Sequence, residues 1–586
     1  MGVDDVGTLW GMARHADTGG ELRTSDGLRL AVREHGDPAA PTVLAVHGYP
    51  DDHTVWDGVV DALADRCHVV TYDVRGAGGS DAPRRTEAYL LDQLADDLVR
   101  VADLVSPDRP VHLLAHDWGA LQAWHAVTEP RLAPRFASLT SISGPCLDHA
   151  GHWMRAQLRP PTPRSLRKLV QQLVFSGYIF FFRLPVVPEL AWRTGLVKRL
   201  IAVLERLDPR AARNPTRPAV SDGVHGLQLY RANVHQRLSR PGQRRATLPV
   251  QVLAPTGDPF VSTPMQTEIT PWVADLRVRR VPGGHWLPRS RPELVARCAA
   301  ELVEHVEGGA EPRALRRARV RPGRREFQDH LVVVTGAGSG IGRETAVAFA
   351  AAGAHVVVAD ADLSAAEDTA ALITRTGAGA SPYQVDLTAG AEDFAARVHA
   401  DLGTPDVVVL DSGTGAASRF LDTPAAEWDR VVDDTVRSVA HGCREFARQM
   451  ADRGEGGQII TLASSAAYSP SPRRSAPSTA GAAVLALSQS LRVELAADGI
   501  GVTAVCPGPG ATRRPRRVAA QVLRAARRGP ALAPATAGAA VGLVLSRLSP
   551  GLLRAAARVQ SAPWWRRSSR VPHRSRRAGP RRAPGP

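Results

Sequence analysis

The chain has 586 residues, which is too long for one hydrophobic core and indicates roughly two to four domains. Its 44% hydrophobic and 22% charged residues are typical of a soluble globular protein. The net charge of +15 does not indicate a nucleic-acid-binding domain, because the excess lies in three arginine-rich segments, 313–325, 513–528 and 561–586. We interpret these arginines as solvated and expect no specific nucleic-acid partner.

The composition also constrains the compartment. Five cysteines lie far apart without paired spacing, which argues against a disulfide framework or a zinc site and fits a reducing cytoplasm. The N-terminus lacks the apolar segment of a signal peptide. The most apolar stretch, 173–187, is interrupted by Arg183 and Pro185 and is too short to span a bilayer. We expect a cytoplasmic protein without a metal site, and peripheral membrane contact stays open.

The first domain is predicted at 22–308, where short β-branched runs alternate with amphipathic helices. This pattern predicts an α/β fold with a parallel sheet. The expected strands are 42–46, 68–72, 111–115, 138–143, 250–254 and 276–281. One long insertion, about 146–246, is mostly helical in pattern and follows a strand. We expect it to form a cap over an active site.

A single aspartate marks the expected active site. Asp117 ends the strand-like run 111–116, and a helical pattern follows it at once. The small residues Ala115 and Gly119 flank it at two positions on either side, as a tight strand-to-helix turn requires. This is the geometry of a nucleophile elbow with aspartate in place of serine. An aspartate nucleophile forms an alkyl ester, which indicates attack on the saturated carbon of an epoxide or alkyl halide.

The residues that would support Asp117 follow in the order that the α/β-hydrolase fold requires. The amides of Tyr49 and Trp118 are expected to form an oxyanion hole for the intermediate of ester hydrolysis. Asp258 and His285 each lie just beyond a predicted strand, in the chain order nucleophile, acid, histidine. We therefore predict that Asp258 and His285 activate water.

Three motifs, 47–50, 73–80 and 115–120, resemble those of the epoxide hydrolases of the α/β-hydrolase superfamily. Haloalkane dehalogenases share much of this set. The insertion contains two tyrosines, Tyr178 and Tyr230, in contexts similar to those of the cap tyrosines with which epoxide hydrolases bind the epoxide oxygen. A phenol donates a hydrogen bond to the ring oxygen and protonates it as the ring opens. The tyrosine pair therefore favours the epoxide over the halide.

A second domain is predicted at 329–560, after an arginine-rich linker at 309–328. The strand 331–334 leads into a glycine-rich turn and a helix from Arg343, which together cradle a pyrophosphate. Asp360, eighteen residues after the last glycine, favours NAD over NADP, and Asp386 fits an adenine contact. The predicted cofactor-binding residues of the turn are Gly336, Ser339, Gly340, Ile341 and Gly342.

Residues 328–512 resemble the short-chain dehydrogenase/reductase family, with further matches at 420–424 and 506–508. The family's catalytic residues are Asn, Ser, Tyr and Lys. Ser464 matches the serine, but Thr435, Pro477 and Gly481 stand at the other three positions. Proline and glycine cannot donate a proton or lower the pKa of a phenol. We predict a degenerate, Rossmann-fold domain that binds NAD without transferring hydride.

The sequence therefore predicts a cytoplasmic epoxide hydrolase fused to a degenerate dehydrogenase domain, an order similar to that of known bifunctional proteins. The run 180–182, three phenylalanines, indicates an apolar or lipid-like epoxide, and the hydrolase domain needs no cofactor. The second domain is a candidate for homodimerisation, and the Arg/Pro-rich tail 561–586 is expected to be disordered. A dehalogenase, an oxidoreductase with an atypical site and a non-catalytic scaffold remain alternatives.

Overall fold

The structure is a computed structural model that describes residues 20–206, 208, 215, 217–411, 418–469, 473–508 and 511–548. The chain divides into two compact units. The first extends to His330 and includes two later segments, Met450–Gly456 and Ala497–Gly499, and the second contains the rest. The predicted tail 561–586 lies outside the described residues.

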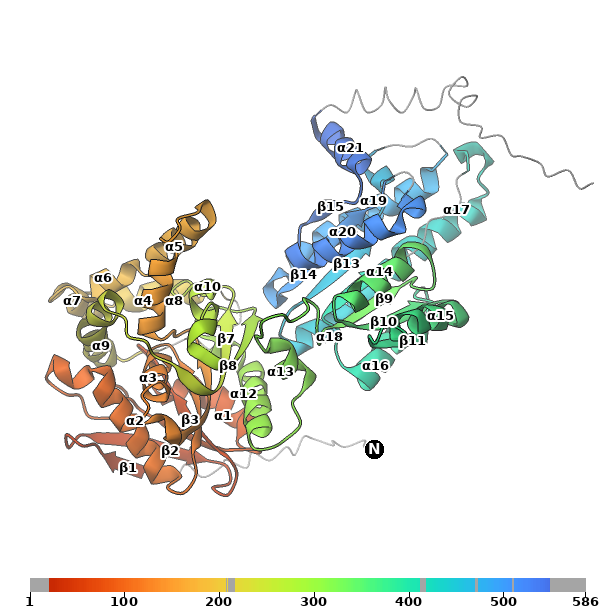
Figure 1. Ribbon diagram of the computed structural model, residues 1–586. Helices are drawn as coiled ribbons and strands as arrows, with labels where there is room; N and C mark the ends of the chain where they lie inside the picture. The colour runs from red at the N-terminus through yellow and green to blue at the C-terminus, as the bar shows by residue number, and fades with distance from the viewer. Residues whose placement is uncertain are drawn as a thin grey trace, which may run out of the picture. The chain divides into compact units, whose positions relative to one another are not determined.

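The first unit is built on an eight-stranded sheet with the order β1-β2-β4-β3-β5-β6-β7-β8 (Figure 1). The strands are β1 (Gly20–Arg23), β2 (Arg29–His35), β3 (Thr42–Val46), β4 (His68–Tyr72), β5 (Val111–His116), β6 (Phe136–Ile142), β7 (Ala246–Pro255) and β8 (Val273–Val281). Strands β3 to β8 pair in parallel, and the α/β fold class is confirmed. Two strands that the sequence analysis did not predict extend one edge of the sheet: β1 pairs antiparallel with β2, and β2 pairs antiparallel with β4.

Helices cover both faces of this sheet, which explains why β3, β4 and β5 are buried along their whole length. Along β3, Leu44 and Val46 pack into one hydrophobic cluster with α2 and α3, and Val43 and Ala45 pack into another with α1 and α12. The helices are α1 (Asp57–Leu63), α2 (Leu91–Val105), α3 (Trp118–Val127), α10 (Thr263–Thr267), α11 (Leu287–Ser290) and α12 (Pro292–Val306). Alternate side chains of one strand thus serve two cores.

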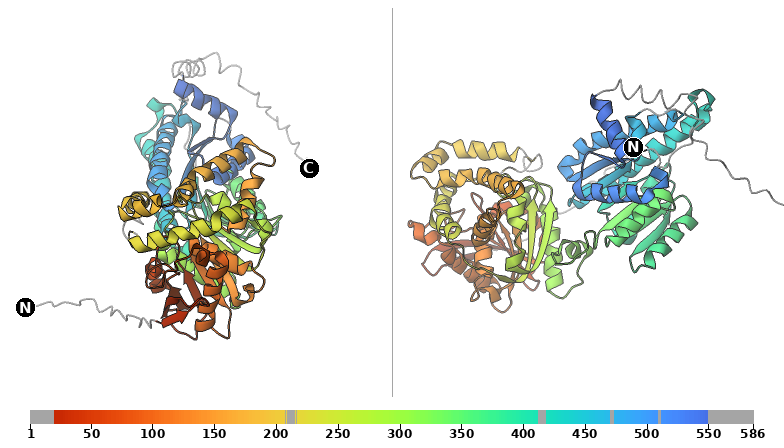
Figure 2. Two further views of the ribbon diagram at one scale, coloured as in Figure 1. Left: turned by 90° about the vertical axis from the view of Figure 1, so that its left-hand side faces the viewer. Right: turned by 45° about the horizontal axis from the view of Figure 1, so that its top comes forward.

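The insertion between β6 and β7 is helical, as its sequence pattern indicates. It contains α4 (Leu147–Ala156), α5 (Pro163–Phe175), α6 (Gly177–Phe182), α7 (Val187–Arg193), α8 (Leu196–Glu205) and α9 (Val220–Ser239). These helices lie together on one side of the first unit (Figure 2). The structure thus has a helical layer where a cap is expected.

The segment 309–328 is more ordered than a plain linker. It contains α13 (Arg313–Ala318), in which Leu315 is fully buried. Its arginines form ion pairs as well as meeting solvent: Arg319 lies 3.0 Å from Asp275, and Arg324 lies 3.0 Å from Asp329. The interpretation of these arginines as solvated missed both ion pairs. Asp275 is distant in the sequence, and Asp329 follows the segment directly, so proximity in the sequence alone does not show that a pair forms.

The second unit has a seven-stranded sheet with the order β11-β10-β9-β12-β13-β14-β15, all parallel. The strands are β9 (Leu331–Thr335), β10 (His355–Asp360), β11 (Ala380–Gln384), β12 (Val407–Leu410), β13 (Gly457–Leu462), β14 (Ile500–Cys506) and β15 (Leu532–Pro534). The order reverses between β9 and β12, as in a doubly wound Rossmann sheet, where a dinucleotide binds at this point. The predicted Rossmann fold is confirmed.

The helices of the second unit alternate with its strands. They are α14 (Gly340–Ala351), α15 (Leu363–Thr374), α16 (Ala391–Leu402), α17 (Ala425–Val432), α18 (Ser438–Arg453), α19 (Ser475–Glu494), α20 (Pro515–Arg528) and α21 (Ala537–Leu548), with a π-helix at Asp433–Arg437. Helix α14 begins three residues earlier than the predicted Arg343, so the last two glycines of the turn belong to its first turn.

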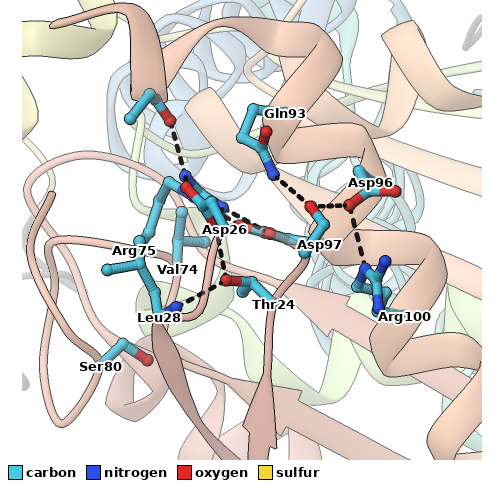
Figure 3. Close-up of polar contacts among 12 residues, drawn as sticks. Thr24, Asp26, Leu28, Val74, Arg75, Ser80, Gln93, Asp96, Asp97 and Arg100 are labelled. Atoms are coloured by element: carbon cyan, nitrogen blue, oxygen red, sulfur yellow. Dashed lines mark hydrogen bonds and ion pairs between the residues drawn. The ribbon is translucent and has the colours of Figure 1, made fainter. Parts of the chain in front are cut away.

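One buried ion pair anchors the motif 73–80 of the first unit (Figure 3). The side chain of Arg75 is fully buried and binds Asp97 in a bidentate arrangement, with both N–O distances 2.6 Å. A second carboxylate, Asp26, accepts from Arg75 Nη1 at 2.9 Å. Asp97 is itself only 2% exposed, so water stabilises neither charge and each is stabilised mainly by the other.

Replacing Asp97 with Ala is therefore expected to destabilise the first unit by about 3–5 kcal/mol, because a buried guanidinium loses its main partner. The neighbouring Asp96 provides a matched control, since it pairs with Arg100 while 43% exposed. Asp96→Ala should cost less than about 1 kcal/mol. Urea unfolding of both variants measures the difference, and equal losses would contradict a structural role for the buried pair.

Candidate active site

Asp117 occupies a strained turn between β5 and α3. Its backbone has φ 49° and ψ −122°, a conformation that non-glycine residues rarely adopt. A Cβ on Gly119 would lie 2.2 Å from the carbonyl oxygen of Val46, and one on Gly144 would lie 2.3 Å from that of Asp117. The turn thus requires glycine at both positions, as the pattern around the predicted elbow indicates for the first.

Two backbone amides hydrogen-bond the Asp117 carboxylate. The amide of Tyr49 donates to Oδ1 at 2.8 Å, and the amide of Trp118 also hydrogen-bonds the carboxylate. A side chain at Gly48 would collide with Asp117, since its Cβ would lie 2.5 Å from the Asp117 Cβ. The close approach of the two turns therefore aims both predicted oxyanion-hole amides at the carboxyl group.

His285 links this carboxylate to a second one. Its Nε2 lies 3.6 Å from Asp117 Oδ2, and its Nδ1 donates to Asp258 Oδ2 at 3.1 Å. The amides of Phe260 and Val261 donate to the other oxygen of Asp258, at 2.8 and 3.1 Å. The second carboxylate is thus fixed by its own loop and orients the imidazole toward the first.

The charges of this triad control the protonation of His285. Burial favours the neutral imidazole, but Asp258 and Asp117 outweigh it and raise the pKa of His285 to about 9. Burial raises the pKa of Asp117 as well, against the favourable effects of His285 and the Tyr49 amide. At neutral pH the free protein therefore favours the imidazolium form of His285.

The two predicted tyrosines come from different cap helices and meet at the same cavity. Tyr178 lies on α6 and Tyr230 on α9, with their ring centroids 5.9 Å apart. Burial raises the pKa of each phenol above its ordinary value, and the negative charge of Asp117 adds to the shift. Both phenols are therefore protonated donors over the whole working range of pH.

Asp117, Trp118 and both tyrosines line a cavity of about 380 Å³. Most of the other lining side chains are apolar and come from the cap and from the loop after β7, including Met154, Leu173, Ile179, Phe180, Leu238 and Phe260. A largely apolar cavity with a few polar groups is the usual form of a small-molecule site.

Several supporting residues were missed by the sequence analysis. His116 Nε2 donates to the carbonyl oxygen of His285 at 2.9 Å and so fixes the loop that carries the imidazole. Asp51 accepts from Trp286 Nε1 at 3.1 Å, and burial raises the pKa of Asp51 to about 6. The positions of His116 beside Asp117, and of Asp51 after the motif 47–50, were the available signals.

The glycine-rich turn of the second unit also has the predicted form. Gly336 and Gly340 adopt φ values of +59° and +54°, which side chains disfavour. A Cβ on Gly342 would lie 2.0 Å from the carbonyl oxygen of Gly336, so only glycine lets the helix approach the turn. Asp360 Oδ2 accepts from the amide of Gly338 at 2.8 Å, which brings the carboxylate to the turn.

The remaining predicted cofactor residues lie on the same edge of the sheet or just beyond it. Ser339 is the N-cap of α14, and Ile341 lines a small cavity with Asp411. Asp386 lies on the loop after β11, where its exposed side chain accepts from Thr388. The turn, Asp360 and the helix N-terminus fit the adenosine and pyrophosphate parts of a dinucleotide.

Comparisons with known proteins bear on both units. The profile "alpha/beta hydrolase fold" matches residues 41–289, and the profile "short chain dehydrogenase" matches 330–522. The "Probable oxidoreductase EphD" of Mycobacterium tuberculosis is 41% identical over 491 residues, covering 82% of this chain and 83% of that protein. The chain belongs to this family of hydrolase–dehydrogenase fusions.

Two further relatives are similar to shorter parts of the chain. "Epoxide hydrolase A" of Mycobacterium tuberculosis is 39% identical over 170 residues, 29% of this chain and 48% of that protein. "7alpha-hydroxysteroid dehydrogenase" of Escherichia coli is 34% identical over 181 residues, 30% of this chain and 69% of that protein. The first half of the fusion is thus an epoxide hydrolase-like hydrolase, and the second a short-chain dehydrogenase domain.

The fusion's dehydrogenase unit brings the predicted degenerate positions together. Thr435, Ser464, Pro477 and Gly481 line one cavity of about 80 Å³. A Cβ on Gly481 would lie 3.1 Å from the Cβ of Ser464. The departures from the family's catalytic set therefore share one site.

Two absences concern only the described part of the fusion. It contains no group of three or more His, Cys, Asp or Glu side chains arranged to hold a metal ion. Among its helices, none has the length and apolar character needed to cross a membrane. All five cysteines are free and buried.

Proposed function

We propose that the hydrolase unit converts epoxides to vicinal diols through an ester on Asp117. The observation that carries this proposal is the convergence of Asp117 and two protonated phenols, Tyr178 and Tyr230, on one apolar cavity. A carboxylate attacks carbon, and two donors assist the departure of a ring oxygen. A halide leaving group has less need of two proton donors.

In the first step, Oδ2 of Asp117 attacks a ring carbon, because Oδ1 is held by the amide of Tyr49. The carbon–oxygen bond of the ring breaks, and its electrons remain on the oxygen, which takes a proton from Tyr178 or Tyr230. The phenolate recovers a proton from the His285 imidazolium through solvent. The products of this step are a hydroxyalkyl ester on Asp117 and a neutral imidazole.

Esterification itself prepares the second step. The charge of Asp117 helps to raise the pKa of His285 to about 9, and the neutral ester removes that contribution. Neutral His285 then takes a proton from water, and the hydroxide attacks the Asp117 carbonyl carbon. The amides of Tyr49 and Trp118 stabilise the oxyanion. Collapse of this intermediate breaks the ester bond, and the departing alkoxide takes the proton of the new carboxyl group. This releases the diol and restores the carboxylate, so that epoxide and water are consumed in equal amounts.

Turnover of matched epoxides and alkyl halides tests this assignment. Purified protein is given apolar epoxides and haloalkanes of equal chain length, and diol formation and halide release are measured. We expect diol from the epoxides and little halide. Faster halide release would support the dehalogenase alternative, and no turnover of either class would support a scaffold.

We also propose that the dehydrogenase unit binds NAD without transferring hydride. The glycine turn and Asp360 would hold the pyrophosphate and the adenosine ribose, and a carboxylate at this place repels the 2′-phosphate of NADP. NAD supplies a hydride acceptor when bound. Pro477 and Gly481 provide neither the phenol nor the ammonium group that the family uses for proton transfer.

Calorimetry with both dinucleotides measures this binding. Asp360→Ala should weaken NAD binding by about 10-fold or more, because it removes the acceptor for the ribose hydroxyls. NADP binding should change less, because the same substitution also removes the charge that repels the 2′-phosphate. Asp362→Ala is a matched control, since Asp362 only caps α15. Hydride transfer with any alcohol or ketone of a broad panel, lost in Gly340→Asp, would contradict the degenerate assignment.

A further inference from the structure

The outer surface of the cap helices carries an unusual concentration of exposed apolar side chains. Of the 22 exposed large apolar side chains in the described part of the chain, 13 lie between Leu158 and Val203. This segment is less than a tenth of the sequence. Contiguous exposed apolar surface marks an interaction site rather than ordinary surface. We call the exposed apolar side chains of 158–203 the cap face.

The cap face is built from helical stripes that point away from the core. On α5, Leu166, Val170 and Val174 recur at four-residue spacing and are 41%, 59% and 72% exposed. On α8, the exposed side chains Leu196, Leu200 and Val203 recur at spacings of four and three residues. An amphipathic helix of a globular protein normally turns such a stripe toward its core. Among the described residues of the first unit, therefore, no hydrophobic partner covers these stripes.

The same segment is strongly basic. Residues 158–206 contain nine Arg or Lys and two Glu, a net charge of +7. Arg164, Arg167 and Arg199 are exposed on the helices that carry the apolar stripes. Apolar side chains flanked by arginine and lysine on a short helix are the pattern of interfacial binding to anionic lipid.

The cavity of the first unit reaches this surface. Leu173 and Phe180 line the cavity together with Asp117, and they are also 48% and 66% exposed. They therefore stand where the cavity meets solvent. Asp117 is 8% exposed and lies at the inner end. An apolar molecule in a bilayer would enter the cavity without crossing water if the cap face were seated on the lipid.

We propose that the cap face docks on anionic membrane surfaces and places the cavity mouth at the lipid. A second copy of the chain is a poorer occupant, because a twofold interface would bring two faces of charge +7 together. Docking itself does not depend on the proposed hydrolysis. Only the delivery of a lipid-borne epoxide to Asp117 rests on that function.

Vesicle co-sedimentation of the full chain tests the docking without requiring catalysis. The wild type should bind vesicles of phosphatidylcholine mixed with phosphatidylglycerol and bind pure phosphatidylcholine at least about 10-fold more weakly. The triple variant Leu166→Ser, Val170→Ser, Val174→Ser should lose about 10-fold or more of the binding to the mixed vesicles. Because this variant keeps every charge, arginines elsewhere in the chain cannot account for the loss.

A matched triple variant, Leu363→Ser, Leu372→Ser, Val493→Ser, alters exposed apolar side chains of the second unit and should bind like the wild type. Unchanged unfolding midpoints of both variants show that the fold is kept. Equal binding by the cap variant and the wild type would overturn the proposal. So would a dimer that only the cap variant loses, which would identify a second copy as the occupant.

Turnover then separates docking from chemistry. A long-chain epoxide in mixed vesicles should be hydrolysed about 10-fold more slowly by the cap variant, while a dissolved small epoxide is hydrolysed at the wild-type rate. If the cap variant bound vesicles poorly but hydrolysed both substrates at the wild-type rates, the delivery role would be overturned. Absence of all turnover with intact vesicle binding would refute the proposed hydrolysis and leave the docking standing.

Discussion

Asp117→Ala is expected to lower epoxide turnover by about four orders of magnitude or more, because alanine offers no atom that can attack carbon. Alanine is smaller than aspartate, so the substitution introduces no clash in the strained turn beside Gly119 and Gly144. Binding of an apolar epoxide should persist, because the cavity wall is otherwise unchanged. Diol formation under saturating substrate measures the loss.

The covalent ester distinguishes a nucleophile from a residue that only shapes the cavity. His285→Gln removes the base while leaving Asp117 and the two tyrosines in place, so the ester should form and persist. Mass spectrometry of the intact variant should show an increase equal to the mass of the epoxide. His305→Gln, at a partly exposed histidine of α12, is the control and should show none.

Two outcomes would contradict this assignment. Undiminished turnover in Asp117→Ala would show that another group attacks the substrate. An increase in mass that persisted in the double variant Asp117→Ala, His285→Gln would place the ester on a different residue. Peptide mapping of the labelled protein locates the modified side chain in either case.

The structure brings the residues predicted for the hydrolase site close together, and each of them was predicted from a short segment with a fixed local geometry. The run 111–116 is buried on both faces, and Gly119, two residues after Asp117, indicates a tight turn at that point. Asp258 and His285 are placed by the order of strands in the fold rather than by sequence distance. The structure brings them within 3.1 Å of each other, although 27 positions separate them.

The features that the sequence did not predict depend on long-range pairing. Strand β1 is short and mostly exposed, and β2 is largely polar in sequence, so their antiparallel pairing could be recognised only from the sheet. The buried partner of Arg75 lies on α2, twenty-two residues away, and no local pattern connects the two. The cap face is equally invisible in the sequence, because the same apolar stripe would be read as a core stripe until the helices are packed.

The second large effect concerns the two cap tyrosines. Tyr178→Phe and Tyr230→Phe should each slow ring opening by about 10–1000-fold, the range for a positioned acid or one lost hydrogen-bond donor. Either variant keeps the aromatic packing, since Tyr178 contacts Phe260 and Phe182 through its ring at centroid distances of 5.2 and 5.5 Å. The loss therefore reports the hydroxyl group rather than the shape of the cavity.

The double variant should be slower by about 10⁴-fold, because no donor remains for the departing oxygen. Tyr72→Phe, a fully buried phenol on β4 outside the cavity, is the matched control and should leave the rate unchanged. Single-turnover formation of the ester in a His285→Gln background measures ring opening alone and excludes effects on ester hydrolysis. If the double variant opened epoxides at the normal rate, the phenols would not be the proton donors. If it also kept or gained halide release, the dehalogenase alternative would account for the site, because attack by Asp117 on a haloalkane needs no proton for its leaving group.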